Sequence, residues 1–218
     1  MGSDLIKTYF PEIDQVAIKR LEQLQDLYNL WNQRINVISR KDLSNLYVNH
    51  VLHSLSLAKV IPFRAGEKVL DIGTGGGFPG IPLAILHPDL DFTLIDARGK
   101  KIKVVREISK TLALENVNPV HTRAEEFKGT YHYVLNRAVT FFPKLVEWSA
   151  GYFSGLTGVR DVHGLYSLKG GYLEDEISGW KDMVEIYRIE NYFKEDYFKA
   201  KCIVFLAAEK LIARSAGR

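Results

Sequence analysis

The chain has 218 residues, of which 46% are hydrophobic and 25% charged, the composition of an ordinary soluble globular protein. No run reaches the roughly 18 apolar residues of a membrane span, so no membrane partner is expected. The single cysteine, Cys202, excludes an internal disulfide and a cysteine-rich zinc site, which fits the cytoplasm. The net charge of +3 excludes a bulk polycation, so any contact with nucleic acid must come from a local basic cluster.

The first 60 residues have helical periodicity. Apolar residues recur every three or four positions at Ala17, Leu21, Leu24, Tyr28 and Trp31. This spacing predicts one amphipathic helix over about residues 12–33, and a second helical segment is expected over 43–60. We therefore predict an N-terminal helical extension over residues 1–62, preceding a second unit over residues 63–218. The two are expected to form one compact, monomeric protein.

Two histidines, His50 and His53, lie three residues apart in the second helical segment. A helix would place them on one face, as in a metal pair. No nearby acid or cysteine completes a ligand set, so we interpret them as packing or surface residues and expect no metal.

From residue 67 onward, strand-like and helix-like patterns alternate. The strand-like runs are at 68–72, 92–96, 117–121, 132–136, 164–169, 183–189 and 201–207, and the helical ones are near 79–86, 99–113 and 141–153. Alternation of this kind predicts an α/β fold with a mostly parallel sheet covered on both faces. No helix separates the last two strands, which predicts an antiparallel hairpin at one edge of the sheet.

A glycine-rich stretch at residues 69–80, VLDIGTGGGFPG, follows the first of these strands. Gly75, Gly77 and Gly80 fit the G-x-G-x-x-G spacing of a dinucleotide site. Asp71, Gly73, Gly75 and Gly77 instead fit the acid-plus-glycines turn of S-adenosylmethionine-dependent methyltransferases. Asp71 favours the second interpretation, because a carboxylate repels a pyrophosphate and attracts a positive sulfonium–amino-acid cofactor.

A second acid, Asp96, ends the next strand about 25 residues further on, a position suited to the hydroxyls of a ribose. Helix N-capping is the alternative role for this acid. Six basic residues and one acid follow between residues 98 and 110, which indicates either a solvated helix face or a nucleic-acid contact. Lys210, Arg214 and Arg218 recur at the C-terminus, where a second contact and a solvated helix are the alternatives.

Several short motifs occur together in a characteristic order. They are WN at 31–32 with Asn36, HVLHS at 50–54, LDIGTGGGFPGIPLA at 70–84, LID at 94–96, KK at 100–101, RAE at 123–125, NRA at 136–138 and LKG at 168–170. In these motifs, over about residues 20–175, the chain resembles the glucose-inhibited division protein B family, bacterial methyltransferases of 16S ribosomal RNA. His53-Ser54 departs from the Asp-Ser of most members.

This resemblance implies a class I S-adenosylmethionine-dependent methyltransferase fold, Rossmann-like, with a seven-stranded sheet. It also implies methylation of N7 of a guanine in the 530 loop, guanine 527, with 16S ribosomal RNA or the small ribosomal subunit as partner. The cofactor-binding residues expected from the turn and the resemblance are Asp71, Gly73, Gly75, Gly77, Phe78, Asp96, Ala124, Glu125 and Arg137.

Guanine N7 has an in-plane lone pair and no proton at neutral pH, so no general base is required. Catalysis should rest on orientation of the reacting atoms. We expect Arg137, Arg123 and Lys169 to position phosphates, the cofactor carboxylate or the O6 edge. The residues expected to bind RNA are Arg98, Lys100, Lys103, Arg123 and Lys169.

Other functions remain open at this point. An ion pair with Glu125 or Glu126 is the alternative role for Arg123. The alternative activities are methylation of another RNA or of a small molecule, an NAD-dependent oxidation, and non-catalytic RNA binding, because a fold alone does not identify the acceptor.

Overall fold

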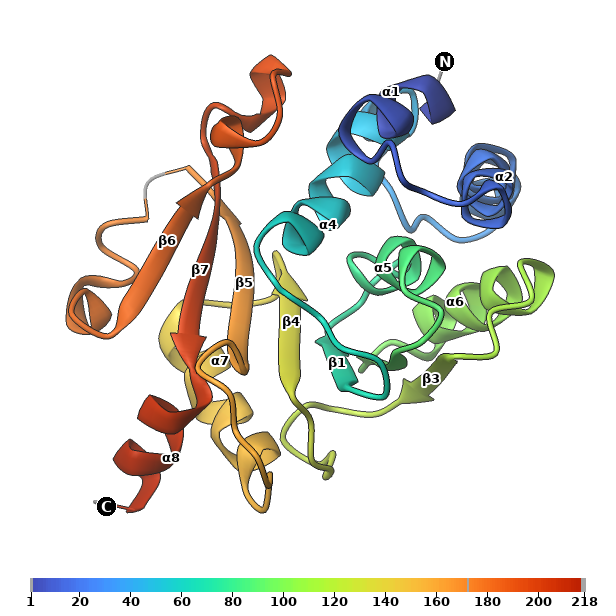
Figure 1. Cartoon of the computed structure of the whole chain (residues 1–218). Coiled ribbons are helices and arrows are strands. Elements are labelled where there is room, and N and C mark those ends of the chain that lie inside the picture. Colours follow the sequence, from blue (N-terminus) through green and yellow to red (C-terminus); the bar gives the residue numbers. More distant parts are fainter. Residues whose placement is uncertain (1, 172, 217–218) are drawn as a thin grey trace.

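The computed structural model describes residues 2–171 and 173–216, which fold around one seven-stranded sheet (Figure 1). The strand order is β3-β2-β1-β4-β5-β7-β6. The strands are β1 (Lys68–Ile72), β2 (Asp91–Asp96), β3 (Val117–His121), β4 (Tyr133–Arg137), β5 (Gly164–Gly170), β6 (Val184–Arg188) and β7 (Lys201–Ala207). This architecture confirms the predicted fold class.

Strands β1 to β5 are parallel, and their register brings the chemically important residues to one edge. Ile72 at the end of β1 pairs with Ile95 of β2 and with Asn136 of β4. Asp96 and Arg137 therefore follow immediately at the same carboxyl edge of the sheet. Ligands bind at this edge of α/β sheets, where the strand order reverses between neighbouring strands.

The last two strands run against the rest of the sheet. β7 pairs antiparallel with β5 on one side and with β6 on the other, so β6 forms the edge. Only two short 3₁₀ turns, Ile189–Asn191 and Asp196–Phe198, lie between β6 and β7. A parallel pairing needs a longer crossover, and the predicted antiparallel hairpin is confirmed.

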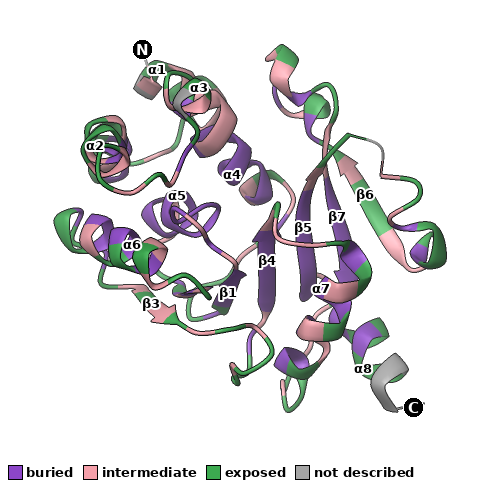
Figure 2. Cartoon of the chain, turned by 180° about the vertical axis from the view of Figure 1, so that it is seen from behind, coloured by how far each residue is buried: buried purple, intermediate pink, exposed green. Residues whose placement is uncertain are grey.

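Helices cover both faces of the sheet, and the buried residues form a layer on each face (Figure 2). One face carries α1 (Gly2–Tyr9), α2 (Gln15–Asn32), α3 (Arg40–Leu43), α4 (His53–Leu55), α5 (Gly80–Leu86) and α6 (Gly99–Thr111). The other face carries α7 (Phe142–Ser149) and α8 (Ala208–Ala216). Within the described residues no helix is both long and apolar enough to cross a membrane.

The N-terminal helices share a core with the sheet. Leu21, Leu24 and Tyr28 of α2 are fully buried in the same apolar cluster as Ile81 of α5. The side chain of Asp14 begins α2 by accepting hydrogen bonds from the backbone N–H groups of residues 16 and 17. The division at residue 62 stays a prediction, and the common core supports the expectation of one compact unit.

The second N-terminal segment differs from the single helix expected over 43–60. It contains α3, a π-helical turn over Tyr47–Leu52, the short α4 and a 3₁₀ turn over Ser56–Lys59. The carbonyl of Asn49, inside the π turn, accepts hydrogen bonds from Arg137 Nη1 and the Tyr197 hydroxyl, each at 3.2 Å. Isolated π turns often occur at functional sites, and this one binds side chains from both β4 and the C-terminal region.

The basic C-terminus begins on α8. Lys210 Nζ donates a hydrogen bond of 2.8 Å to the Met183 carbonyl, so this lysine contacts the protein itself. The side chain of Arg214, and Arg218 as a whole, lie outside the described residues.

Candidate active site

The glycine turn after β1 has the backbone conformation that its composition predicts. Gly73, Gly75 and Gly77 have φ values of +65°, +58° and +99°, which disfavour side chains. A Cβ on Gly73 would lie 2.7 Å from Val139 Cγ2, so the loop after β4 approaches the turn closely. A Cβ on Gly77 would lie 2.4 Å from Ile81 Cδ1, so Gly77 is required for packing against α5.

Asp71 lies beneath this turn and is fully buried. Its Oδ2 accepts hydrogen bonds from Thr74 Oγ1 at 2.6 Å and from the Gly80 backbone N–H at 2.9 Å. Burial raises the pKa of Asp71 to about 7, against the opposing effects of Thr74, Gly80 and Arg137. Asp71 therefore links the end of β1 to the turn and to the start of α5. Through these contacts it fixes the conformation of the turn.

Asp96 connects two loops at the end of β2. Its Oδ2 accepts a hydrogen bond of 2.9 Å from the Gly75 N–H, and its Oδ1 accepts one of 2.8 Å from the Arg98 N–H. The carboxylate thus fixes the glycine turn and the loop that leads into α6. The N-cap residue of α6 is Arg98, and no side chain caps this helix, so Asp96 is not the helix cap considered from the sequence. Each oxygen retains a further lone pair, so these two contacts and ribose binding are compatible.

A cavity of about 390 Å³ opens over the turn between β1, β2, β3 and β4. It is lined by seven of the nine predicted cofactor residues: Gly73, Gly75, Phe78, Asp96, Ala124, Glu125 and Arg137. The other two, Asp71 and Gly77, support the turn from behind. Val37, from the N-terminal extension, and Trp148, from α7, also line the cavity, and neither was predicted from the sequence.

Phe78 forms the centre of an aromatic cluster at one end of the cavity. Its ring stacks on Tyr28 with a centroid distance of 4.8 Å, and the His50 ring lies 5.0 Å away. Arg137 Cζ lies over the Phe78 ring, 5.1 Å from its centroid. The Tyr28 hydroxyl donates a hydrogen bond of 2.6 Å to the Gly76 carbonyl, so α2 directly braces the glycine turn.

Arg137 is held by the N-terminal extension. Its Nη1 donates to the Asn49 carbonyl, and its Nη2 lies 2.6 Å from His50 Nδ1. Burial and the neighbouring Arg137 charge lower the pKa of His50 to about 3, so its imidazole is neutral and Nδ1 accepts the hydrogen bond. The histidine was interpreted from the sequence only as a packing or surface residue.

His53, where the resemblance leads us to expect an acid, is buried among aromatic rings. It makes edge-on contacts with Tyr197 at 5.6 Å and Phe198 at 6.1 Å. Burial, followed by the charges of Arg137 and Lys201, lowers the pKa of His53 well below its usual value. This side chain therefore packs the N-terminal extension against the C-terminal region and carries no charge at neutral pH.

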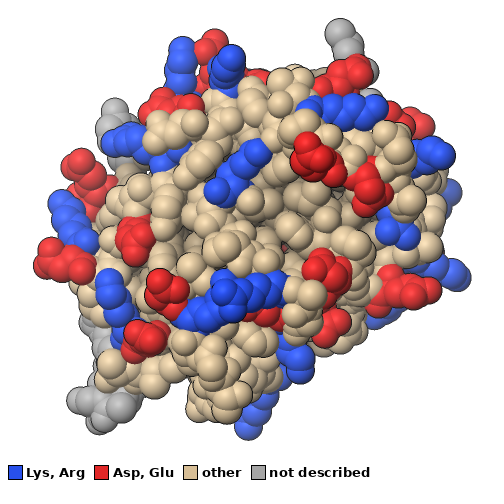
Figure 3. All heavy atoms as spheres, viewed as in Figure 1, with Lys and Arg blue, Asp and Glu red and all other residues tan. Residues whose placement is uncertain are grey.

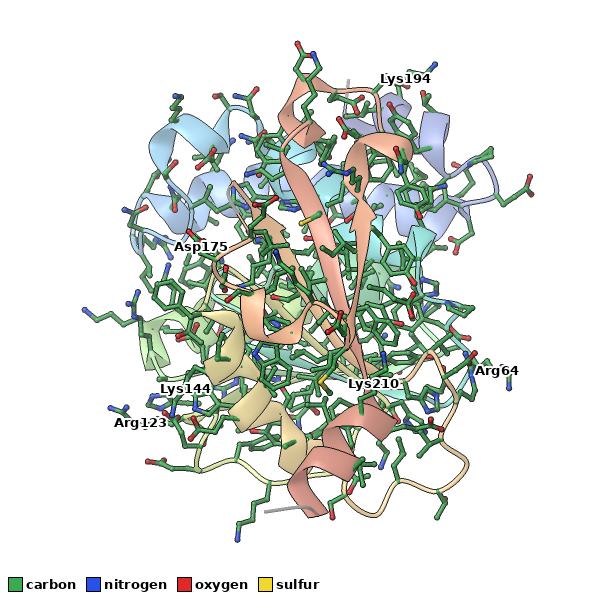
Figure 4. The ribbon with its side chains drawn as sticks, turned by 90° about the vertical axis from the view of Figure 1, so that its left-hand side faces the viewer. Arg64, Arg123, Lys144, Asp175, Lys194 and Lys210 are labelled. Atoms are coloured by element: carbon green, nitrogen blue, oxygen red, sulfur yellow. The ribbon has the colours of Figure 1, made fainter. Side chains whose placement is uncertain are left out.

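The predicted basic residues occupy different positions around the cavity. Arg98 and Arg123 line it, whereas Lys100 and Lys103 are exposed on α6 outside the lining. Lys101 was not selected from the sequence as an RNA contact, but it lines the cavity, and its Nζ donates a hydrogen bond of 2.8 Å to the Asn36 carbonyl. Figure 3 views the molecule from the front of Figure 1, away from the side on which Arg123 lies (Figure 4), and the Lys and Arg side chains on that face are interspersed with Asp and Glu.

Arg123 extends outward from the edge of the molecule (Figure 4). In the described part of the chain, no ion pair joins it to Glu125 or Glu126. Lys169 has the opposite environment: its side chain is 10% exposed, and Nζ is paired with Glu176 and donates to the Thr140 carbonyl at 3.1 Å. A phosphate contact by Lys169 would compete with this ion pair, so the expected RNA-binding role is better suited to Arg123.

The sequence and the fold were compared with those of known proteins. Residues 17–201 match the family model described as rRNA small subunit methyltransferase G. A protein of that name from Christiangramia forsetii is 46% identical over 206 residues, covering 94% of this chain and 97% of the relative. A second one, from Bacteroides thetaiotaomicron, is 46% identical over 202 residues and covers 93% and 98%.

Solved structures show the same fold at low sequence identity. A SAM-dependent methyltransferase from Aquifex aeolicus has a TM-score of 0.53 and 15% identity, covering 78% of this chain and 98% of that protein. A precorrin-6y C5,15-methyltransferase from Geobacter metallireducens has a TM-score of 0.54 and 13% identity, with coverage of 79% and 90%.

Proposed function

The chain belongs to the rRNA small subunit methyltransferase G family, and we propose that it transfers the methyl group of S-adenosylmethionine to N7 of a guanine in the 530 loop of 16S ribosomal RNA. The observation that carries this proposal is the family match over residues 17–201, which spans both the helical extension and the cavity. The acceptor position within the RNA follows from the family resemblance.

The cavity has the features that this cofactor requires. Gly73 leaves space where a side chain would collide with Val139, and Asp96 presents a carboxylate for the ribose hydroxyls. Ala124 and Glu125 line the cavity beyond the end of β3, where they are suited to the adenine edge. Phe78 and Arg137 contact each other in the cavity lining, and the guanidinium is suited to the carboxylate of the methionyl group.

The cofactor supplies an electrophilic methyl group on a positively charged sulfur. Guanine N7 attacks with its own lone pair, and the residues of this chain have only to orient the reactants and exclude water. Arg137 is suited to orientation because two hydrogen bonds to the N-terminal extension fix its guanidinium. His50 is neutral, and its Nδ1 accepts a hydrogen bond from Arg137 Nη2. His50 therefore serves as a positioning residue for Arg137.

RNA would approach the rim of the cavity. Arg98, Lys101 and Arg123 line this rim and provide positive charge for phosphates. Lys100 and Lys103 extend the basic surface along α6. Contacts of this kind release counterions, so binding should weaken steeply as salt concentration rises.

Calorimetric titration with S-adenosylmethionine and with NAD tests the cofactor. We expect binding of the first and none of the second, and tight binding of NAD alone would exclude the methyltransferase function.

For the acceptor, small subunits from cells lacking the activity are incubated with cofactor carrying a tritiated methyl group. Label in ribosomal RNA supports the proposal, whereas label only in the small-molecule fraction of a cell extract would assign a different substrate.

A further inference from the structure

Phe141 is an exposed aromatic residue at the start of α7. Its exposed fraction is 75%, the highest among the large hydrophobic side chains of the described residues. Neighbouring Phe142 is fully buried, so the chain had an apolar core position available one residue further on. The exposed ring does not contribute to the core, so its aromatic face is free to contact a ligand.

Phe141 lies in the chain between two residues that line the cavity. Val139, two residues earlier, lines the cavity, and two peptide units separate the Cα atoms of Val139 and Phe141 by at most about 7.6 Å. Trp148, seven residues later on α7, lines the same cavity. The backbone of Phe141 is therefore close to the cavity that would hold the methyl donor, on the side of β4 and α7.

The backbone on both sides of Phe141 is fixed by one ion pair. Lys169 Nζ donates to the Thr140 carbonyl at 3.1 Å, and Glu176 Oε1 accepts from the Phe142 N–H at 2.6 Å. Lys169 and Glu176 also pair with each other, with exposed side-chain fractions of 10% and 18%. The Phe141 carbonyl in turn accepts from the N–H groups of residues 144 and 145 at the start of α7. The Phe141 side chain therefore extends from an ordered loop. Because the backbone of this loop is already fixed, it loses little conformational entropy when a ligand binds.

We propose that Phe141 stacks on the guanine that receives the methyl group, a role that rests on the proposed function. Enzymes that act on a base take it out of its stack and hold it against apolar or aromatic side chains. Methylation at N7 gives the guanine ring a positive charge, and the face of an aromatic ring attracts positive charge. The stacking contact is therefore stronger in the transition state than in the bound substrate, and its loss lowers kcat as well as weakening binding.

The test compares Phe141→Leu, which keeps an apolar side chain but removes the aromatic face, with Phe141→Trp, which keeps that face. Because stacking on an aromatic side chain contributes about 1–3 kcal/mol per base, kcat/KM on small subunits should fall roughly tenfold or more in Phe141→Leu. Part of this loss should appear in kcat. Phe141→Trp should retain most of the activity. Val16→Ala, at a 58% exposed apolar position on α2, is the matched control and should equal the wild type.

Affinity for S-adenosylmethionine and the melting temperature should be the same in all four proteins, because Phe141 contacts neither the core nor the glycine turn. The stacking role would be overturned if Phe141→Leu had the kcat/KM of the wild type. It would also be overturned if weaker cofactor binding or a lower melting temperature explained the loss of activity. If the wild type itself does not methylate small subunits, the proposed function fails and the stacking role fails with it. Activity in the wild type and an unchanged Phe141→Leu would remove the stacking role alone.

Discussion

The guanidinium of Arg137 and the imidazole of His50 share a hydrogen bond of 2.6 Å, from Nη2 to Nδ1. The two residues are 87 positions apart in the chain, and their contact joins the end of β4 to the π turn of the N-terminal extension. The extension therefore holds a side chain that lines the candidate active site. Four predictions follow from this contact and from the glycine turn.

The His50 contact predicts a pH dependence of stability. Burial and the Arg137 charge lower the pKa of His50 to about 3 in the folded protein, whereas a histidine in an unfolded chain titrates near about 6.5. Between these values only the unfolded state binds the proton, so this histidine's contribution to stability is complete above about pH 6.5 and is lost as pH falls. The loss at pH 5 is up to about 2 kcal/mol.

His50→Asn keeps an acceptor near Nδ1 and removes the titration. Urea unfolding at pH 7 and pH 5 should show a smaller fall in the free energy of unfolding for this variant than for the wild type. His121→Asn, at an exposed position, is the matched control and should behave as the wild type does. An equal fall in His50→Asn and wild type would contradict the assignment of a buried neutral histidine.

Removal of the Arg137 side chain should reduce both stability and activity. The Arg137→Ala substitution leaves the Asn49 carbonyl and His50 Nδ1 without this donor. We expect a cost of about 2 kcal/mol in the free energy of unfolding, together with weaker cofactor binding in calorimetry. An Arg137→Ala protein with wild-type stability would show that these hydrogen bonds do not contribute to folding.

Cofactor binding should release a proton from Asp71. Burial raises the pKa of Asp71 to about 7, so a substantial part of the carboxyl groups is protonated at pH 6.5. A positively charged cofactor above the turn favours the carboxylate, and the proton then passes to the buffer. Titrations in phosphate and in Tris at pH 6.5 should give different enthalpies, and this difference should disappear at pH 8.5 and in Asp71→Asn. Equal enthalpies in both buffers at pH 6.5 would exclude the coupling.

The glycine turn provides a matched pair of substitutions. Gly73 and Gly66 both have positive φ values, +65° and +79°, so alanine causes similar backbone strain at either position, about 1 kcal/mol. A Cβ at Gly73 would collide with Val139, whereas at Gly66 nothing lies within 4 Å. Gly73→Ala should therefore abolish cofactor binding in calorimetry, and Gly66→Ala should retain it. Similar affinities in the two variants would mean that the turn does not form the cofactor site.

Local sequence patterns were sufficient to predict the sheet and most of the selected residues that line the cavity. Glycines with positive φ and acids at strand ends have local causes, so residues 69–80 and Asp96 pointed to this edge of the sheet. The contacts of Lys169 with Glu176 and of His50 with Arg137 depend on how loops and helices meet in space, and no periodicity records them. The basic helix shows the same limit: the helical rotation directs Lys101 toward the cavity and leaves Lys100 and Lys103 outside it.

Mapping the methylated position in the RNA tests most directly whether this protein methylates guanine N7 in the 530 loop. Small subunits from a strain lacking this protein are incubated with the purified enzyme and S-adenosylmethionine. The RNA is then cleaved chemically at N7-methylguanosine and mapped by primer extension. We expect one new cleavage site, in the 530 loop, that is absent without the cofactor. A modified RNA with no cleavage in that loop, or with cleavage elsewhere only, would contradict it.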